Sequence, residues 1–126
     1  MKLYWASRQG KAHAVAALLA KQGVDVNQTT NDGITPLLMA SWKGHAEVVS
    51  MLLAKQGIDV NQARDNGATP LLIASQNGHA EVVSMLLAKQ GVNVNQAKNN
   101  GCTPLYIASQ NGHAEVVSML LATQGV

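Results

Sequence analysis

The apolar positions of the chain fall into short blocks that return at a fixed interval. Val48, Val49, Leu52 and Leu53 have the one-and-four spacing of a buried helical face. The same block returns 34 residues later, and again 34 residues after that. A fixed period of this length is the sequence signature of a stacked repeat protein. The pattern therefore predicts an all-α repeat solenoid.

Each copy predicts two short helices. The first should begin with Thr35 as N-cap ahead of a proline and end at Gly44, because glycine tolerates the positive φ of a helix end. The second should run from about His45 towards Gly57, with Glu47 in its first turn, where the helix dipole favours negative charge. Helices of roughly nine to twelve residues are marginal alone in water, so stacking of the copies must stabilise them.

The loops between the helix pairs predict hairpin-like fingers, roughly perpendicular to the helices. Asn66-Gly67 and Asn100-Gly101 are strong turn dipeptides, and β-branched residues precede them. The first copy carries several small or polar replacements, which suits an end unit with one side facing water. We expect a single domain, residues 1–126, with a partial first unit and a truncated last one. The expected units are residues 1–29, 30–63, 64–97 and 98–126.

The repeated letters resemble the ankyrin repeat over essentially the whole chain. From residue 32 the sequence reads DGITPLLMASWKGHAEVVSMLLAKQGIDVN, which is similar to the pattern DGxTPLxxAxxxGHxEVVxxLLxxxGxDVN. The resemblance implies a non-enzymatic module that binds a partner protein through its finger loops and a concave groove. The residues that match are Gly33, Thr35, Pro36, Leu37, Ala40, Gly44, His45, Glu47, Val49, Leu52, Leu53, Gly57, Asp59, Val60 and Asn61.

The chain departs from the family pattern in two places. Leu38, Leu72 and Tyr106 stand where the family usually has a histidine that bonds to the threonine, so apolar or aromatic packing is expected instead. The period is 34 residues rather than the usual thirty-three, and the extra residue lengthens the turn between Leu53 and Gly57. Neither departure is expected to change the fold.

Residues that differ between the copies are the candidate contact surface, because the constant residues perform the same packing role in each copy. By motif position, the resemblance places them on the finger tips and on the groove side of the first helix. Thr30, Arg64 and Lys98 open the variable finger segments. The candidate contacts are Arg8, Gln9, Asn31, Asp32, Ile34, Trp42, Lys43, Asp65, Asn66, Ala68, Gln76, Asn77, Asn99, Asn100, Cys102, Tyr106, Gln110 and Asn111. The alternative is that single variable positions drift without a function.

Two interpretations of Trp42 stay open. The other full copies have glutamine there, so the core does not require an aromatic side chain, and exposed tryptophan is enriched among binding hot spots. Alternatively, the ring folds over the first unit beside Tyr4 or Trp5. Trp5 itself aligns with apolar residues such as Met39, so we expect it in the core.

Composition narrows the class of protein. The 126 residues carry 13% charged side chains and a net charge of +2, without the clustered Lys and Arg expected of a nucleic-acid-binding face. One cysteine excludes an intramolecular disulfide and suits a reducing compartment. No apolar run reaches the length of a membrane span, and the first residues lack the apolar core of a signal peptide. We expect a cytoplasmic protein without membrane or nucleic-acid partners.

The residues with potential chemistry favour structural roles. His45, His79 and His113 recur at the repeat period, and stacked repeats lie roughly 10 Å apart, too far for one zinc ion with bonds of about 2 Å. HAEVV lacks the second histidine of HExxH, and the single Cys102 has no evident base beside it. His13 is expected to face solvent. We expect no catalytic residue, metal or cofactor; an enzyme or metal protein is the least favoured alternative.

The two ends of the array differ. Val116, Val117, Leu120 and Leu121 keep the apolar character of the internal copies, with no polar replacement. We therefore expect either a longer array or association of this C-terminal face with another molecule, including self-association. The near-identity of the copies also fits a structural spacer or an engineered scaffold without a natural ligand.

Overall fold

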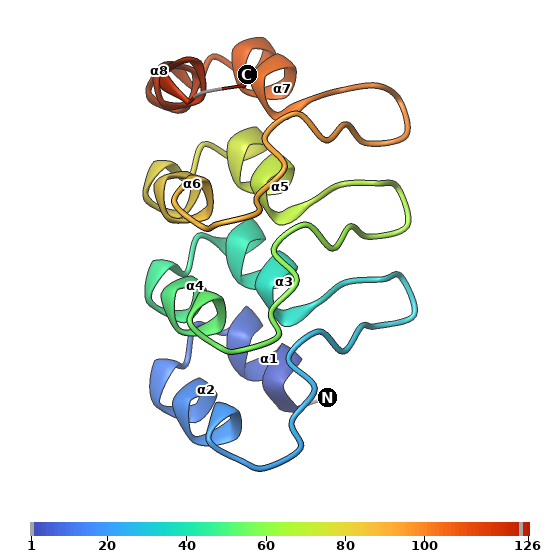
Figure 1. Ribbon diagram of the computed structural model, residues 1–126, viewed down its shortest axis with the longest axis vertical. Helices are drawn as coiled ribbons and strands as arrows, with labels where there is room; N and C mark the ends of the chain where they lie inside the picture. Colours follow the sequence, from blue (N-terminus) through green and yellow to red (C-terminus); the bar gives the residue numbers. More distant parts are fainter. Residues whose placement is uncertain (1, 124) are drawn as a thin grey trace.

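Short helices stack in successive pairs in the computed structural model, which describes residues 2–123 and 125–126. The pairs pile up along the long axis of the molecule (Figure 1), and no strand occurs in the described residues. The prediction of an all-α repeat solenoid is confirmed. The eight helices within these described residues are α1 (Lys2–Arg8), α2 (Ala12–Leu19), α3 (Pro36–Lys43), α4 (Ala46–Leu53), α5 (Pro70–Gln76), α6 (Ala80–Leu87), α7 (Pro104–Gln110) and α8 (Ala114–Ala122).

The helix boundaries follow the predicted capping residues. The Thr35 hydroxyl accepts a hydrogen bond from the Leu38 N–H at 3.1 Å, and proline occupies the first turn of α3. Gly44 ends that helix at φ 76°, in the left-handed region that favours glycine. The observed helices have 7 to 9 residues, so the expected length of nine to twelve was too long. The second helix of the repeat already ends at Leu53, because a separate turn precedes Gly57.

The helices form two layers. The first helices of the pairs, α1, α3, α5 and α7, stack on one another, and α2, α4, α6 and α8 form the second layer (Figure 1). Leu37, Leu52, Leu71 and Leu86 are fully buried between the layers. Leu38 and Leu72 are also fully buried, which confirms the apolar packing expected at the family's usual histidine position, whereas Tyr106 is 55% exposed.

The loops between pairs form the predicted fingers. In the second finger the Arg64 N–H donates to the Ala68 carbonyl at 3.0 Å, and the Gly67 N–H donates to the Arg64 carbonyl at 2.8 Å. The Asp65 N–H also donates to the Asp32 carbonyl of the first finger at 3.1 Å. The fingers extend from the first helix layer, away from the second (Figure 1). Adjacent fingers are thus tied to each other as well as to their own repeats.

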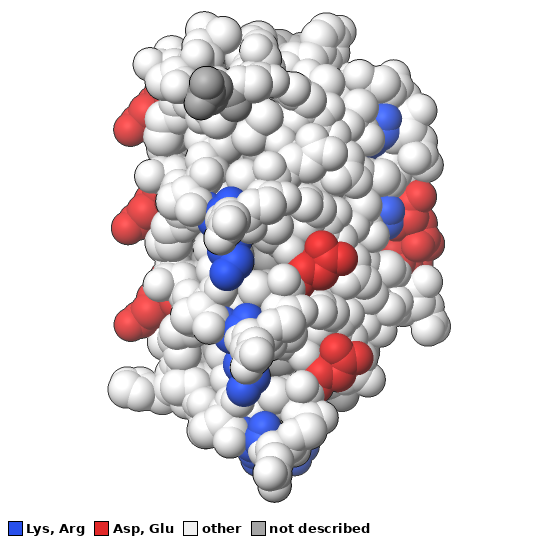
Figure 2. Space-filling view, viewed as in Figure 1, with Lys and Arg blue, Asp and Glu red and all other residues white. Residues whose placement is uncertain are grey.

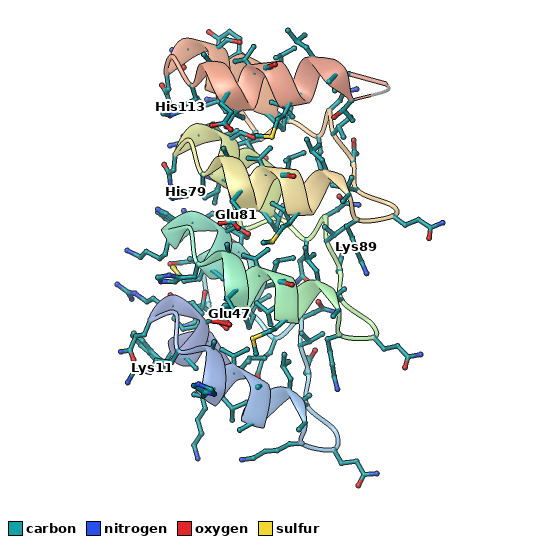
Figure 3. The ribbon with its side chains drawn as sticks, turned by 90° about the vertical axis from the view of Figure 1, so that its left-hand side faces the viewer. Lys11, Glu47, His79, Glu81, Lys89 and His113 are labelled. Carbon is teal, nitrogen blue, oxygen red and sulfur yellow. The ribbon has the colours of Figure 1, made fainter. Side chains whose placement is uncertain are left out.

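The recurring histidines join successive repeats. His79 Nε2 lies 2.9 Å from the Trp42 carbonyl oxygen, and His113 Nε2 lies 2.9 Å from that of Gln76. Figure 3 shows His79 and His113 at the same end of successive repeats, with Lys11 at the corresponding place in the first. The structural role predicted for these histidines is confirmed, and His13 is exposed as expected.

Two further ladders run along the stack. Asn61 Nδ2 donates to the Gly91 carbonyl at 2.8 Å, and Asn61 Oδ1 accepts from the Asn93 N–H at 2.8 Å. Lys89 Nζ donates to the Leu53 carbonyl of the preceding repeat at 2.9 Å. The lysine ladder was not predicted, because it depends on a carbonyl of another repeat that spacing alone does not identify.

Candidate partner-binding groove

Most of the predicted contact residues lie on the surface. Trp42, Gln76 and Cys102 are half-buried. The exposed candidates are Arg8, Gln9, Asn31, Asp32, Lys43, Asp65, Asn66, Asn77, Asn99, Asn100, Tyr106, Gln110 and Asn111.

Two finger residues are core residues, so the expected exposure of Ile34 and Ala68 was wrong. Their exposed fractions are 7% and 3%, and they pack with Met39 and Ile73 in a second apolar cluster between the fingers and the first helices. Each follows the glycine of the finger turn, where the returning arm approaches its helix. Sequence variation at these positions therefore changes packing under the finger.

The prediction for Trp5 was also wrong, because its side chain is 53% exposed. In the internal repeats the equivalent position, Met39, packs in the cluster that contains the finger residue Ile34. Trp5 is not a member of this cluster, although its neighbour Tyr4 is. The Trp5 ring instead meets Tyr4 edge-on at 5.3 Å between centroids, and the Arg8 guanidinium lies 5.3 Å from its centroid.

Trp42 is half-buried and lines a pocket, so its interpretation as a contact residue stays a prediction. Its ring is half-buried against the second apolar cluster, and the Arg64 guanidinium carbon lies 5.4 Å from the ring centroid. This is the range of a cation–π contact. Trp42 therefore points towards the second finger, while the aromatic pair of the first unit is Tyr4 with Trp5.

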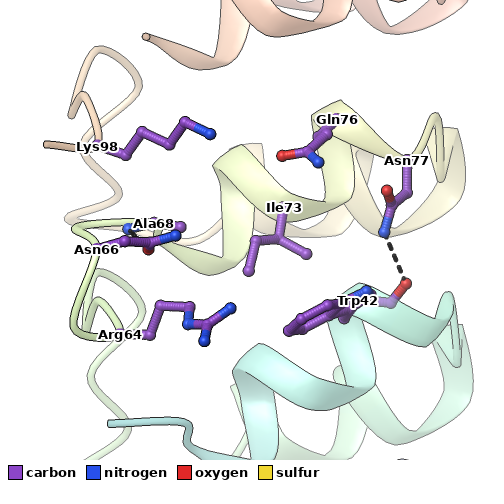
Figure 4. A pocket seen from close by; sticks show the side chains of 8 residues that line it. All are labelled: Trp42, Arg64, Asn66, Ala68, Ile73, Gln76, Asn77 and Lys98. Carbon is purple, nitrogen blue, oxygen red and sulfur yellow. Dashed lines mark hydrogen bonds between the residues drawn. The ribbon is translucent and has the colours of Figure 1, made fainter. Parts of the chain in front are cut away.

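A pocket of ≈ 110 Å³ lies beside Trp42 (Figure 4). Asn77 Nδ2 donates to the Trp42 carbonyl at 3.1 Å, next to the bond from His79, and so fixes the end of α3 against α5. The pocket spans two helices and two fingers, and its lining residues are Trp42, Arg64, Asn66, Ala68, Ile73, Gln76, Asn77 and Lys98. Five of these are predicted contact residues: Trp42, Asn66, Ala68, Gln76 and Asn77. Arg64 and Lys98 occupy the same position in successive fingers, and this equivalence is the sequence signal for their proximity.

Charged side chains recur along the stack. Acidic side chains recur along one edge in Figure 2, where α4, α6 and α8 lie, and each of these helices has a glutamate in its first turn. On the finger side both signs occur. Within residues 2–123 and 125–126, no Lys or Arg nitrogen lies within 4.0 Å of an Asp or Glu oxygen. Arg64 Nε is buried without a hydrogen-bond partner.

The last helix pair presents an apolar face. Leu121 is 64% exposed, whereas the equivalent Leu53 is 8% exposed beneath the following repeat. Leu121 borders an open groove of ≈ 490 Å³. Its lining residues are Ser109, Gly112, Ala114, Val117, Ser118 and Leu121.

Two kinds of feature are absent from the described part of the chain. None of its helices combines the length and hydropathy needed to cross a membrane. No group of three or more His, Cys, Asp or Glu residues there is arranged to hold a metal ion.

The sequence of the chain matches the model of a known family. The model of the family described as ankyrin repeats (three copies) matches residues 2–64 and 57–126. A comparison with curated proteins finds no match. The family match covers nearly all of the sequence and agrees with its stacked helix pairs. The chain therefore belongs to the ankyrin repeat family.

Proposed function

We propose that residues 1–126 act as one non-enzymatic domain that binds a partner protein through its fingers and the adjoining groove. Ankyrin repeats generally mediate protein–protein interaction and are typically without catalytic activity. The observation that supports this site most directly is the half-buried Trp42 beside a polar pocket between two fingers. Tryptophan is enriched among residues that dominate binding energy.

The framework around Trp42 favours binding without a large ordering cost. The Trp42 carbonyl receives hydrogen bonds from both His79 and Asn77, and the neighbouring fingers are bonded to each other. A surface that is ordered before its partner arrives loses less conformational entropy on binding. The exposed finger residues Asp32, Asp65 and Asn66 would form the rim of this contact.

Affinity capture tests the proposal. The immobilised domain is incubated with a cell lysate, and bound proteins are compared between the original chain, Trp42→Ala and Asp65→Ala. Glu81→Ala is the matched control, because Glu81 is exposed on α6 in the other layer. A partner lost with Trp42→Ala and kept with Glu81→Ala supports the groove as the binding site. A partner that Trp42→Ala and Asp65→Ala both retain would contradict the groove as the binding site.

The alternative function is a structural spacer or an engineered scaffold without a natural ligand. This alternative predicts that no protein is enriched over an unrelated immobilised control. The proposal also includes a cytoplasmic location, which rests on the composition and the single cysteine. Imaging of a tagged chain tests that location separately.

We also propose that two copies associate through their C-terminal faces. The support is the exposed Leu121 beside Val117 on a face whose equivalents are covered in the internal repeats. Sedimentation over a range of concentrations should show dimers that Leu121→Lys abolishes. Monomers at every concentration would overturn this second proposal and leave the groove unaffected.

A further inference from the structure

The second and third fingers place two cations at one pocket. Arg64 and Lys98 stand at equivalent positions, and both line the cavity beside Trp42 (Figure 4). The equivalent residue of the first finger is the uncharged Thr30, so two neighbouring cations occur only at the second and third fingers. Asp65 follows Arg64 directly in sequence, yet no carboxylate lies within ion-pairing distance of either cation in the described residues. The positive charge of the pocket is therefore not neutralised locally.

Arg64 has an unused hydrogen-bond donor at this point. Its guanidinium lies over the Trp42 ring, and Nε is buried without a hydrogen-bond partner among the described residues. Buried polar groups in folded proteins are nearly always paired, because an unpaired donor loses its hydration without compensation. Nε itself is enclosed, but the same guanidinium has four further N–H donors, which a bound oxygen acceptor in the pocket can use. A carboxylate is the best match, because arginine binds carboxylates with strong, charge-assisted hydrogen bonds.

The size and lining of the pocket indicate what carries that carboxylate. Its volume of ≈ 110 Å³ is well below the roughly 300–1,000 Å³ of pockets that hold drug-sized molecules. It suits one inserted side chain. Ile73 and the Trp42 ring provide apolar surface for a short aliphatic stem, and the Asn66 and Gln76 amides supply further polar groups at the edge (Figure 4).

We infer that this pocket, defined by Trp42, Arg64 and Lys98, receives a glutamate or aspartate side chain from an extended acidic segment of the partner protein. The carboxylate accepts hydrogen bonds from Arg64 and Lys98, while its stem lies along Ile73 and Trp42. This inference rests on the proposed protein-binding function and adds the chemistry of the partner. The polypeptide chain of the partner would run across the second and third fingers.

Nuclear magnetic resonance titration with short peptides tests the inference at the pocket itself. The probe is Ac-Gly-Glu-Leu-Glu-Gly-NH₂, and its twin has glutamine in place of both glutamates. The reporters are the Trp42 Nε1–H and Arg64 Nε–H signals, and the Trp5 indole is an internal control outside the pocket. We expect saturable shifts of Trp42 and Arg64 with the glutamate peptide, weakened by added salt, and none with its twin.

Variants separate the pocket from general charge attraction. Arg64→Gln with Lys98→Gln should weaken binding of the glutamate peptide by at least about tenfold, since both charge-assisted bonds are lost. Lys11→Gln with Lys21→Gln is the matched control, because it also removes two positive charges, from exposed side chains outside the pocket. It should leave the affinity unchanged. Unaltered dispersion of the other amide signals shows that each variant remains folded.

Several results would overturn the inference: no saturable shift at millimolar peptide, equal shifts from the glutamine twin, or unchanged affinity in the double variant. Binding of a phosphoserine peptide, or of a free C-terminal carboxylate, without binding of the glutamate peptide would also overturn it. A captured protein that depends on Trp42 but not on Arg64 and Lys98 would refute the acidic segment and leave the proposed function intact. Glutamate-peptide binding without any captured protein would refute the proposed function instead.

Discussion

The imidazole of His79 lies directly over Gly44 of the preceding repeat. A Cβ added at Gly44 would lie 2.7 Å from His79 Nδ1, while Nε2 of the same ring lies 2.9 Å from the Trp42 carbonyl oxygen. The same arrangement recurs between the other successive repeats. Gly44 therefore has two functions: it adopts the positive φ that ends α3, and it leaves room for the histidine that links the next repeat.

Gly44→Ala should destabilise the protein more than Gly57→Ala. Both glycines have positive φ, which costs an alanine roughly 1–2 kcal/mol. A Cβ at Gly44 would crowd the His79 ring, which should add about 1–3 kcal/mol to the loss of stability. Nothing lies within 4 Å of a Cβ at Gly57. Urea unfolding followed by circular dichroism measures both free energies. Equal losses would show that the histidine moves aside without cost.

His79→Ala should lower the free energy of unfolding by about 1–2 kcal/mol, because the Trp42 carbonyl loses a hydrogen-bond partner and packing over Gly44 is lost. His13→Ala is the control: that side chain is exposed, and its removal should change stability by less than about 0.5 kcal/mol. Thermal and urea unfolding of the two variants give the comparison. Identical stabilities for both would refute the structural role of the histidine ladder.

Asn61→Ala should cost about 1–2 kcal/mol of stability, since one side chain supplies two hydrogen bonds of 2.8 Å to the next repeat. Asn31→Ala removes the same amide from an exposed finger position and should be nearly neutral. Amide hydrogen exchange would locate the loss of protection at the Asn93 N–H, which donates to Asn61 Oδ1. Loss spread evenly along the stack would indicate a general rather than a local effect.

Trp42→Ala should weaken the affinity for the captured partner by about 30-fold, which corresponds to the loss of roughly 2 kcal/mol at a binding hot spot. Trp5→Ala removes a more exposed ring on α1, outside the pocket, and should change the affinity by less than about threefold. Calorimetric titration of the purified partner measures both. A larger effect of Trp5→Ala than of Trp42→Ala would indicate that the partner contacts the first repeat instead of the pocket.

The helices and fingers could be predicted from sequence because their signals are local. Thr35 caps a helix with its own hydroxyl, Gly44 ends it through its own φ, and a few finger residues such as Arg64 and Ala68 close a hairpin among themselves. Each of these features depends on residues close in the chain. The repeat period then indicated that such units must stack.

The environment of the candidate site depended on contacts across repeats. Trp5 and Met39 share one register position, yet Trp5 is exposed while Met39 packs in the cluster that contains the finger residue Ile34. Ile34 varies between copies like a contact residue but is buried by its own first helix layer. The pairing of Arg64 with Trp42 joins different repeats. Sequence by itself determined the repeating unit, whose hydrogen bonds are local; tertiary structure decided which side chains meet solvent, since burial depends on which neighbour lies alongside.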